Sequence, residues 1–389
     1  MRILVTDGMD KTALAQLKAN GHDVVEQFYE PDALGAALKE FDVCVVRSAT
    51  KVRAQHIDQA KEGRLKLIIR GGVGVDNIDV KYAEDNGITV RNTPRASSNS
   101  VAELAIAHML SCARFVSVAG HTMREGKWEK KAYGKGIEIG GKTLGVIGYG
   151  RIGQALGRMA QALGMQVLAY DIFKVDGLEC DTMHYVEMDE LLAKSDFISL
   201  HTPSIDGKPF INAETIAKMK DGVHLLNFSR AELVDADALK DALESGKVAS
   251  YVTDFPTDAV LGMKNTVAIP HLGASTPESE ENCASMAACQ LRDYLEFGQI
   301  RNSVNFPEIL LGYSEGTRVL IIHENEPGMV SAISAAIGAR KININNMLNK
   351  SRKNMAVTVL ELDKLPDQRL LTELMALPGV IRVRCFHEE

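Results

Sequence analysis

Short apolar runs alternate with amphipathic segments along the first 95 residues of the chain. Five of these runs have the length and composition of buried strands: Arg2–Thr6, Val24–Gln27, Val43–Val46, Leu67–Arg70 and Thr89–Arg91. Alternation of strand and helix predicts a parallel sheet with helices packed on its faces. The same alternation resumes over residues 96–281, so we predict a second parallel α/β domain there.

The pattern changes after residue 281. A long helical pattern at Asn282–Phe297 returns the chain, and we expect residues 282–305 to complete the first domain, begun by residues 1–95. Beyond it, two strands and two helices are expected: Val319–His323, Met329–Ala339, Met355–Leu362 and Gln368–Leu377. With a strand beginning near Ile342 and one at the end, the order is βαββαβ, a ferredoxin-like arrangement. We therefore predict a small separate domain over residues 317–389, joined by a linker at 306–316.

The most informative polar feature is a glycine-rich turn between two predicted strands of the second domain. An apolar run ends in Gly148-Tyr-Gly-Arg-Ile-Gly153, a helical segment follows, and the strand Gln166–Tyr170 then delivers Asp171. Glycines at 148, 150 and 153 permit a tight turn, close approach of the backbone to a pyrophosphate, and close helix–strand packing. The helix N-terminus offers amides to phosphate. Because a carboxylate at Asp171 accepts hydrogen bonds from ribose hydroxyls and repels a 2′-phosphate, we predict a dinucleotide site that prefers NAD to NADP.

Charged residues follow predicted strands downstream of this turn. Arg230 ends the run that begins at Leu225, His271 follows Ala268-Ile-Pro, and Asp254 and Asp258 lie on the loop between them. Oxidation of an alcohol beside a carboxylate needs a base for the proton, a cation for the carboxylate, and a nicotinamide for the hydride. An ordinary pKa of about 6.5 suits His271 to the first role, and a planar, two-pronged donor suits Arg230 to the second. A carboxylate at Asp258 would orient His271 and raise its pKa.

Composition narrows the class of protein. The 389 residues are 46% hydrophobic and 24% charged, with a net charge of −7, which argues against nucleic acid as a partner. The sequence has no apolar stretch of membrane-spanning length and begins with a strand pattern rather than a signal peptide, so we expect a cytoplasmic protein without membrane contact. The six cysteines are scattered without a CxxC pair, so reduced thiols and no metal site are expected.

Taken in order, the motifs resemble those of the D-isomer-specific 2-hydroxyacid dehydrogenases. The resemblance covers residues 1–305 and rests on four motifs: Gly148–Gly153 with Asp171, Ser199–Pro203, Asn227–Arg230 and Pro270–Ser275. Within that family the chain looks closest to the branch that oxidises 3-phospho-D-glycerate, because of Gly74–Asn77, Gly126–Trp128 and a last domain that resembles ACT regulatory domains. The resemblance implies two Rossmann-like doubly wound domains and NAD-dependent oxidation of 3-phosphoglycerate to 3-phosphooxypyruvate, the first step of L-serine biosynthesis. It also implies a homodimer or homotetramer.

The resemblance assigns roles position by position. Arg230 would bind the substrate carboxylate and carbonyl, and His271 would be the acid and base, with Asp258 as its partner. The residues expected to bind the cofactor are Gly148, Gly150, Arg151, Ile152, Gly153, Asp171, Thr202, Pro203, Phe228, Ser229, Asp254, Gly273 and Ala274. The residues expected to bind the substrate are Arg47 and Lys130, at the phosphate, and Val73 and Gly74, at the carboxylate. In the last domain His323, Asn325 and Asn343 match effector-binding positions, and L-serine is the expected effector.

Departures from the family pattern leave alternatives open. The family usually has Asp-Val-Phe-x-x-Glu where this chain has Thr253-Asp-Phe-Pro-Thr-Asp258, and Ala231 replaces the usual glycine after the arginine. Counting from Phe-Pro-Thr puts Asp258 in the glutamate position and Thr253 at the cofactor-contacting aspartate, whereas a deletion restores Asp254 to that role. Alternative functions are the same chemistry on another D-2-hydroxy acid, such as glycerate or lactate, and an NAD-sensing binding protein with little catalysis.

Overall fold

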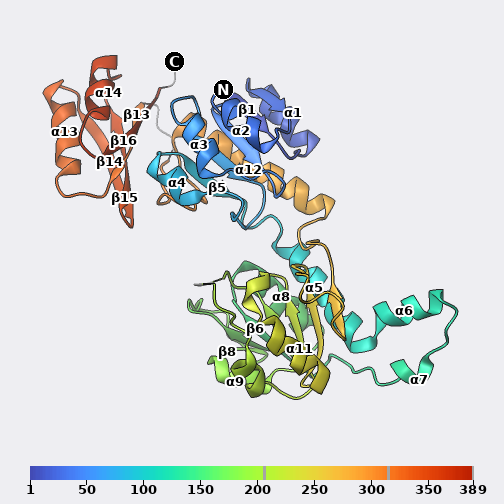
Figure 1. The fold of residues 1–389 in the computed structure, drawn as a ribbon. Helices are drawn as coiled ribbons and strands as arrows, with labels where there is room; N and C mark the ends of the chain where they lie inside the picture. The colour runs from blue at the N-terminus through green and yellow to red at the C-terminus, as the bar shows by residue number, and fades with distance from the viewer. Residues whose placement is uncertain (205–206, 313–315, 388–389) are drawn as a thin grey trace. The chain divides into compact units, whose positions relative to one another are not determined.

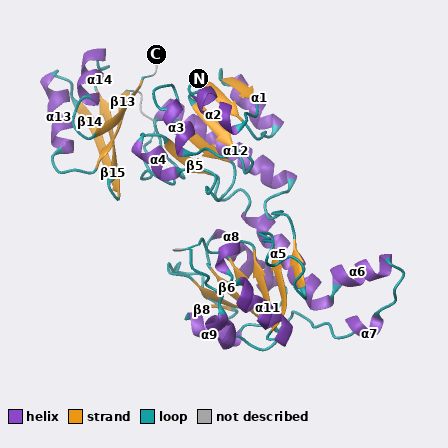
Figure 2. Cartoon of the chain, in the orientation of Figure 1, coloured by secondary structure: helices purple, strands orange, loops and turns teal. Residues whose placement is uncertain are grey.

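The computed structural model describes residues 1–204, 207–312 and 316–387, and the chain divides into two compact units. One unit comprises Met1–Ala96 with Glu280–Glu389, and the other comprises Ser97–Ser279. The first contains a five-stranded parallel sheet and a four-stranded antiparallel sheet, and the second contains a seven-stranded parallel sheet (Figures 1 and 2). The predicted class, two parallel α/β domains and a small antiparallel C-terminal domain, is confirmed.

The first sheet has the strand order β2-β1-β3-β4-β5. Its strands are β1 (Arg2–Val5), β2 (Asp23–Glu26), β3 (Val43–Val46), β4 (Leu67–Arg70) and β5 (Thr89–Asn92). The helices between them are α1 (Lys11–Ala19), α2 (Pro31–Leu38), α3 (Ala54–Ala60) and α4 (Val80–Asp85). All four residues of β3 are buried, as expected of a parallel strand covered on both faces. The chain leaves β1 in opposite directions to β2 and β3, so the loops after β1 and β3 lie at the topological switch point of this sheet.

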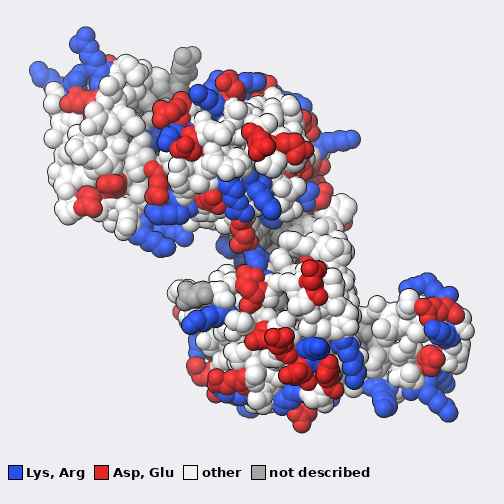
Figure 3. All heavy atoms as spheres, in the orientation of Figure 1, with Lys and Arg blue, Asp and Glu red and all other residues white. Residues whose placement is uncertain are grey.

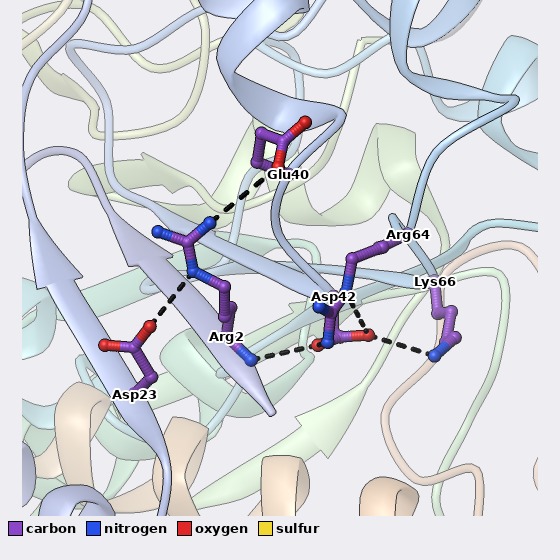
Figure 4. A network of polar contacts seen from close by, with 6 residues as sticks. All are labelled: Arg2, Asp23, Glu40, Asp42, Arg64 and Lys66. Atoms are coloured by element: carbon purple, nitrogen blue, oxygen red, sulfur yellow. Dashed lines mark hydrogen bonds and ion pairs between the residues drawn. The ribbon is translucent and has the colours of Figure 1, made fainter.

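Asp42, which precedes β3, joins three segments at the amino-terminal edge of the sheet (Figure 4). Its carboxylate is 1% exposed and accepts hydrogen bonds from the Arg2 amide at 2.9 Å, from Arg64 at 2.7 Å and from Lys66 at 3.0 Å. Burial alone would raise the pKa of Asp42, but these donors outweigh it and lower the pKa to about 2. Asp42 is therefore a charged, fully paired group of the folded core.

The second unit has the strand order β12-β11-β10-β9-β6-β7-β8. Its strands are β6 (Thr143–Ile147), β7 (Gln166–Tyr170), β8 (Met183–Tyr185), β9 (Phe197–Leu200), β10 (Val223–Asn227), β11 (Val248–Thr253) and β12 (Thr266–Ala268). Its helices are α5 (Ser98–Arg114), α6 (Val116–Arg124), α7 (Lys130–Tyr133), α8 (Arg151–Ala162), α9 (Met188–Lys194), α10 (Ala213–Lys218) and α11 (Ala236–Ser245), with a 3-10 turn at Ala231–Leu233. The order reverses at β6, which places the loops after β6 and β9 at the switch point.

Helices α6 and α7 project from this unit away from its sheet (Figure 1). No residue of α6 is buried, although Val116, Val118 and Met123 are apolar. Across the described ranges no single helix has the length and hydropathy to cross a membrane, and only α5 and α6 taken together, bent by 66°, meet those criteria.

The C-terminal domain is a four-stranded antiparallel sheet in the order β14-β15-β13-β16, with two helices on one face. Its elements are β13 (Thr317–Glu324), α13 (Met329–Ala339), β14 (Ile344–Arg352), β15 (Met355–Leu362), α14 (Gln368–Met375) and β16 (Val380–Phe386). The other face packs on the first α/β domain and on α12 (Pro277–Phe297), and the two share one hydrophobic core. Phe306 and Ile309, within the expected linker, are buried in that core, and residues 313–315 of the linker lie outside the described residues.

Candidate active site

The glycine-rich turn connects β6 to α8 at the switch point of the second sheet. Gly148 has a φ of +89°, and a Cβ there would lie 2.5 Å from the carbonyl oxygen of His201. A Cβ at Gly153 would meet the Gly148 carbonyl oxygen, so α8 can approach the strand only because residue 153 has no side chain. A Cβ at Gly150, the residue before α8, would meet nothing within 4 Å, and the helix has no side-chain cap. Open space in front of uncapped amides is what a pyrophosphate needs.

Asp171 follows β7 directly, as the sequence predicts. One of its carboxylate oxygens accepts a hydrogen bond from the Phe173 amide at 3.0 Å, which fixes the side chain at the end of the strand. Two large apolar side chains follow it and are highly exposed, Ile172 at 71% and Phe173 at 77%. An exposed apolar pair beside the carboxylate that is predicted to bind ribose suits the flat face of an adenine ring. Sequence reasoning missed this pair, although the apolar letters after Asp171 could have indicated it.

The loop after β9 lies against the glycine-rich turn. The His201 amide donates to the Ile147 carbonyl oxygen at 2.7 Å, and the His201 ring shares a 2.8 Å hydrogen bond with Ser199. Burial lowers the pKa of His201 to about 4, so its ring is neutral at pH 7. Its Nδ1 atom is buried and has no hydrogen-bond partner in the described part of the chain. The predicted cofactor residues Thr202 and Pro203 continue this loop on the partly exposed side.

The structure brings Arg230 and His271 to the same aromatic side chain. The Arg230 guanidinium lies over the ring of Phe255 at 5.3 Å, and the His271 ring lies 4.4 Å from the Phe255 ring at an angle of 44°. Arg230 also donates to the carbonyl oxygen of Ser229 at 2.6 Å. Phe255 thus contacts both the cation and the imidazole, a role that the sequence did not indicate because Phe255 lies in a loop without apolar periodicity.

The turn that carries His271 is held by Asp254. The His271 amide donates to the Asp254 carbonyl oxygen at 3.0 Å, and the Gly273 amide donates to the Asp254 carboxylate at 3.2 Å. His271 has a φ of +47°, an uncommon value outside glycine. Burial raises the pKa of Asp254 to about 6, against the opposing hydrogen bond from Gly273 and the charge of Arg230.

Asp254 also tests whether the site fits a nicotinamide cofactor. Its Oδ1 atom is buried and has no hydrogen-bond partner among the described residues. A buried carboxylate oxygen without a donor is costly unless a ligand supplies one, and a carboxamide N–H is such a donor. Thr253 is fully buried at the end of β11, and its hydroxyl accepts a hydrogen bond from the Phe255 amide at 3.0 Å. This arrangement favours Asp254 over Thr253 as the cofactor contact.

The remaining predicted cofactor residues line the same edge of the sheet. Ser229 is buried and donates to the Leu200 carbonyl oxygen at 2.7 Å, and Phe228 packs against the ring of His108 at 5.9 Å. Gly273 is buried and Ala274 is half-buried. Arg151 and Ile152 begin α8.

Asp258 has a different environment from the other predicted catalytic residues. It is exposed, in the turn after β11, and its side chain makes no hydrogen bond or ion pair with any described residue. The pairing of Asp258 with His271 therefore stays a prediction. Lys130 begins α7 and is exposed as well.

The predicted substrate residues of the first unit lie at carboxyl ends of its strands. Arg47 follows β3 at the switch point, where its amide donates to Asp7 at 2.7 Å and its guanidinium pairs with Glu280 at 2.8 Å. Val73 and Gly74 lie in the loop after β4, and the Val73 carbonyl oxygen accepts from Asn92 at 2.7 Å. The Arg47 cation and the loop at Val73 and Gly74 therefore lie at the same edge of the first sheet.

The three predicted effector residues do not converge within one chain. His323 is 1% exposed, and its two ring nitrogens are hydrogen-bonded to the Glu324 carbonyl oxygen at 2.7 Å and to Thr358 at 2.8 Å. Asn325 donates to Lys353 at the same end of the sheet. Asn343 precedes β14, which begins opposite Leu362, six residues along β15 from the partner of His323. At 3.3–3.4 Å per residue the two ends are roughly 20 Å apart, further than an amino acid reaches.

The chain is similar in sequence and in structure to several known proteins. The sequence profile of the D-isomer specific 2-hydroxyacid dehydrogenase NAD-binding domain matches residues 106–273. A hydroxypyruvate reductase of Thermotoga maritima is 47% identical over 72% of this chain and 93% of its own. A D-3-phosphoglycerate dehydrogenase of Haemophilus influenzae is 33% identical over 100% of this chain and 97% of its own. The structure of a D-lactate dehydrogenase of Aquifex aeolicus in complex with NAD and lactic acid superposes with a TM-score of 0.68, at 27% identity, over 79% of this chain and 100% of that one.

Proposed function

Because this chain belongs to the D-isomer-specific 2-hydroxyacid dehydrogenases and is an NAD-dependent enzyme of that family, we propose that its substrate is 3-phospho-D-glycerate. The product would be 3-phosphooxypyruvate, the precursor from which L-serine is made. The observation that carries the chemistry is the contact of both Arg230 and His271 with one aromatic ring, that of Phe255. The similarity of the whole chain, C-terminal domain included, to a D-3-phosphoglycerate dehydrogenase supports the substrate.

Different residues of this chain would bind the cofactor and the substrate. NAD, when bound, supplies the acceptor for the hydride that leaves the alcohol carbon. Gly148, Gly150 and Asp171 would hold its pyrophosphate and ribose, and the unpartnered oxygen of Asp254 would orient its carboxamide. Arg230 binds the carboxylate and polarises the forming carbonyl, since a guanidinium donates two parallel hydrogen bonds.

His271 takes the hydroxyl proton on its imidazole during oxidation and returns it during reduction. The left-handed backbone of His271 and its contact with Phe255 fix where the ring points. Asp258, in its exposed turn, would be the carboxylate that stabilises the imidazolium.

Arg47 is the proposed contact for the substrate phosphate. It lies at the switch point of the first sheet, where ligands of open α/β sheets bind. Arg47→Gln should raise KM for 3-phosphooxypyruvate about tenfold or more, because a charge-assisted contact is lost, and leave KM for hydroxypyruvate within about twofold. Arg53→Gln is the matched control, because Arg53 is an arginine of the same unit that pairs with Asp79 at 2.9 Å. Equal effects of Arg47→Gln on both acids would refute the phosphate assignment.

Glyceric acid is the second candidate substrate. The observation in its favour is the 47% identity to a hydroxypyruvate reductase, which is higher than the 33% identity to the full-length relative. A better kcat/KM for hydroxypyruvate than for 3-phosphooxypyruvate would select it.

We infer further that the enzyme is a homodimer or a homotetramer in which a second copy covers α6. Val116 and Met123 on α6 and Trp128 in the loop between α6 and α7 form one projecting arm. Their exposed fractions are 60%, 52% and 77%, which is unusual for so many large apolar side chains in one segment. Trp128 is the only tryptophan of the chain, so its emission reports on this surface alone. Dilution that separates the copies should shift the emission to the red. An unchanged spectrum through dissociation would exclude this arm from the interface.

L-serine is the proposed effector of the C-terminal domain. Since His323 and Asn343 are roughly 20 Å apart in one chain, one ligand contacts both only if two copies of the domain supply them. Millimolar L-serine should therefore inhibit the oligomer, and Asn343→Ala should relieve inhibition without changing kcat. If L-serine changes neither activity nor melting temperature, this assignment fails.

A further inference from the structure

Helix α12 is hydrogen-bonded to β5 and to Thr93, the residue that follows it, at several points. Near the start of the helix, the Thr93 hydroxyl donates to the Cys283 sulfur at 3.3 Å. In the middle, the Gln290 side chain donates to the Asn92 carbonyl oxygen at 2.9 Å, and Arg91 donates to the Gln290 carbonyl oxygen at 2.7 Å. Near the end, the hydroxyls of Tyr294 and Thr89 share a 3.1 Å hydrogen bond. The helix is therefore joined to the strand and the residue after it at Cys283, Gln290 and Tyr294.

The same strand end holds the loop after β4. The Gly72 amide donates to the Thr93 hydroxyl at 2.6 Å, and the Asn92 side chain donates to the Val73 carbonyl oxygen at 2.7 Å. Thr93 also contacts α12 at Cys283, and Asn92 also contacts it at Gln290. The position of the loop at 72–74 therefore depends on the position of the helix.

The C-terminal domain packs against the carboxyl-terminal end of α12. The Arg384 guanidinium, on β16, lies 4.4 Å from the ring of Tyr294 and 4.5 Å from the ring of Phe386, while Arg91 covers Tyr294 at 4.7 Å. Tyr294 and Arg91 are both fully buried. We expect this stack to keep a single closely packed arrangement. Without the Tyr294 ring, the buried Arg91 guanidinium would lose both packing and electrostatic stabilisation.

A second arginine of β16 and one of β13 strengthen this docking. Arg382 donates to the Leu65 carbonyl oxygen at 3.0 Å, and Arg318 donates to the Phe297 carbonyl oxygen, the last of α12, at 2.7 Å. The sheet of the C-terminal domain is thus fixed to both the helix and the first α/β domain.

We propose that α12 couples the C-terminal domain to the loop at 72–74, so that a change in the packing of β16 on Tyr294 alters how firmly that loop is held. The loop is the proposed binding place of the substrate carboxylate, and to that extent the inference rests on the proposed function. A ligand or partner that engages the C-terminal domain would then act on the KM of the 2-oxo acid and leave NAD affinity unchanged.

Hydrogen–deuterium exchange on the full chain tests the coupling without reference to any substrate. Arg384→Met keeps the length of the side chain but removes the charge above Tyr294, and Tyr294→Phe keeps the ring but removes the hydroxyl bonded to Thr89. Lys350→Gln is the matched control, because Lys350 joins the C-terminal domain to the Glu308 carbonyl oxygen rather than to α12. Melting curves establish that each variant is folded before exchange is measured.

We expect peptides that contain Gly72 to exchange about three to ten times faster in Arg384→Met and Tyr294→Phe than in the parent protein, and at the parent rate in Lys350→Gln. KM for 3-phosphooxypyruvate should rise by a similar factor, with the Kd of NAD unchanged. Parent-like exchange in both Arg384→Met and Tyr294→Phe would overturn the coupling, and so would an equal increase in Lys350→Gln. Faster exchange with an unchanged KM would uphold the coupling and refute the assignment of residues 73–74 to substrate binding.

Discussion

The ring of His271 lies 4.4 Å from the ring of Phe255, whose surface the Arg230 guanidinium also covers. Because Phe255 contacts both groups, we expect Phe255→Leu to lower kcat/KM about ten- to a hundredfold, since misplacement of reacting groups by 1 Å has effects of that order. Steady-state kinetics measure this, with Phe28→Leu, a change at an exposed ring of the first unit, as the control. Parent kinetics in Phe255→Leu would show that Arg230 and His271 are positioned by other contacts.

Removal of the imidazole tests the acid–base role directly. His271→Asn should lower kcat about 10²- to 10⁴-fold, the usual contribution of a positioned proton-transfer group. NAD binding, followed by calorimetry, should stay within about twofold because His271 is not among the proposed cofactor contacts. His184→Asn, at an exposed histidine of the same unit, is the control. Unchanged turnover in His271→Asn would remove this role, whereas absent turnover in the parent enzyme with NAD binding intact would favour an NAD-sensing protein.

Asp254 should contribute to cofactor binding at the expense of stability. Burial raises its pKa to about 6, so between about pH 4 and pH 6 the folded protein binds more protons at this carboxyl than the unfolded chain does. The contribution of Asp254 to the free energy of unfolding therefore falls as the pH rises through that window. Asp254→Asn should remove this decline, stabilise the protein by roughly 1–3 kcal/mol at pH 7.5, and raise the Kd of NAD about tenfold.

Denaturant unfolding from pH 4 to 7.5 and calorimetric titration with NAD measure both effects. An unchanged Kd in Asp254→Asn, with a raised Kd in Thr253→Val, would transfer the cofactor contact to Thr253. A steeper pH dependence than that of the parent would contradict the sign of the pKa shift.

Asp42 should have the opposite effect on stability. Its pKa is lowered to about 2, so its charged form stabilises the fold above its ordinary pKa of about 3.9 and that contribution is lost as the pH falls toward 2. Asp42→Asn should lower the free energy of unfolding by about 2 kcal/mol at pH 7. The difference between the two proteins should shrink progressively as the pH falls from about 4 and should vanish only below the folded pKa, at about pH 1. A difference that does not depend on pH would mean that Asp42 acts through packing rather than through charge.

The sequence predicts most elements because apolar runs that are buried on both faces have clear limits. The bounds expected for β3, β4, β7, α13 and β15 are those of the structure. Helix α12 begins at Pro277, before the predicted start at Asn282. The prediction began too late because the first turns of the helix are polar and show no apolar periodicity. The signal was nevertheless present: Thr276 caps the helix by accepting from the Ser279 amide at 3.1 Å, and proline occupies the first helical position.

The site is predictable only where a motif has a fixed spacing. The glycine-rich turn and Asp171 are local, so the sequence locates them within a few residues. The contact of Phe255 with Arg230 joins residues 25 positions apart, and that of Arg384 with Tyr294 joins residues 90 positions apart. No periodicity encodes such pairs, because they depend on which loop ends and which sheet faces the fold brings together.

The oxidation of NADH by the parent enzyme, with 3-phosphooxypyruvate set beside hydroxypyruvate, pyruvate and 2-oxoglutarate, tests the central claim most directly. We expect kcat/KM for 3-phosphooxypyruvate to exceed that for each of the other acids at least about tenfold, since one charge-assisted contact to the phosphate is worth that much. A higher kcat/KM for hydroxypyruvate or another unphosphorylated acid would contradict the claim and move the enzyme to a different D-2-hydroxy acid.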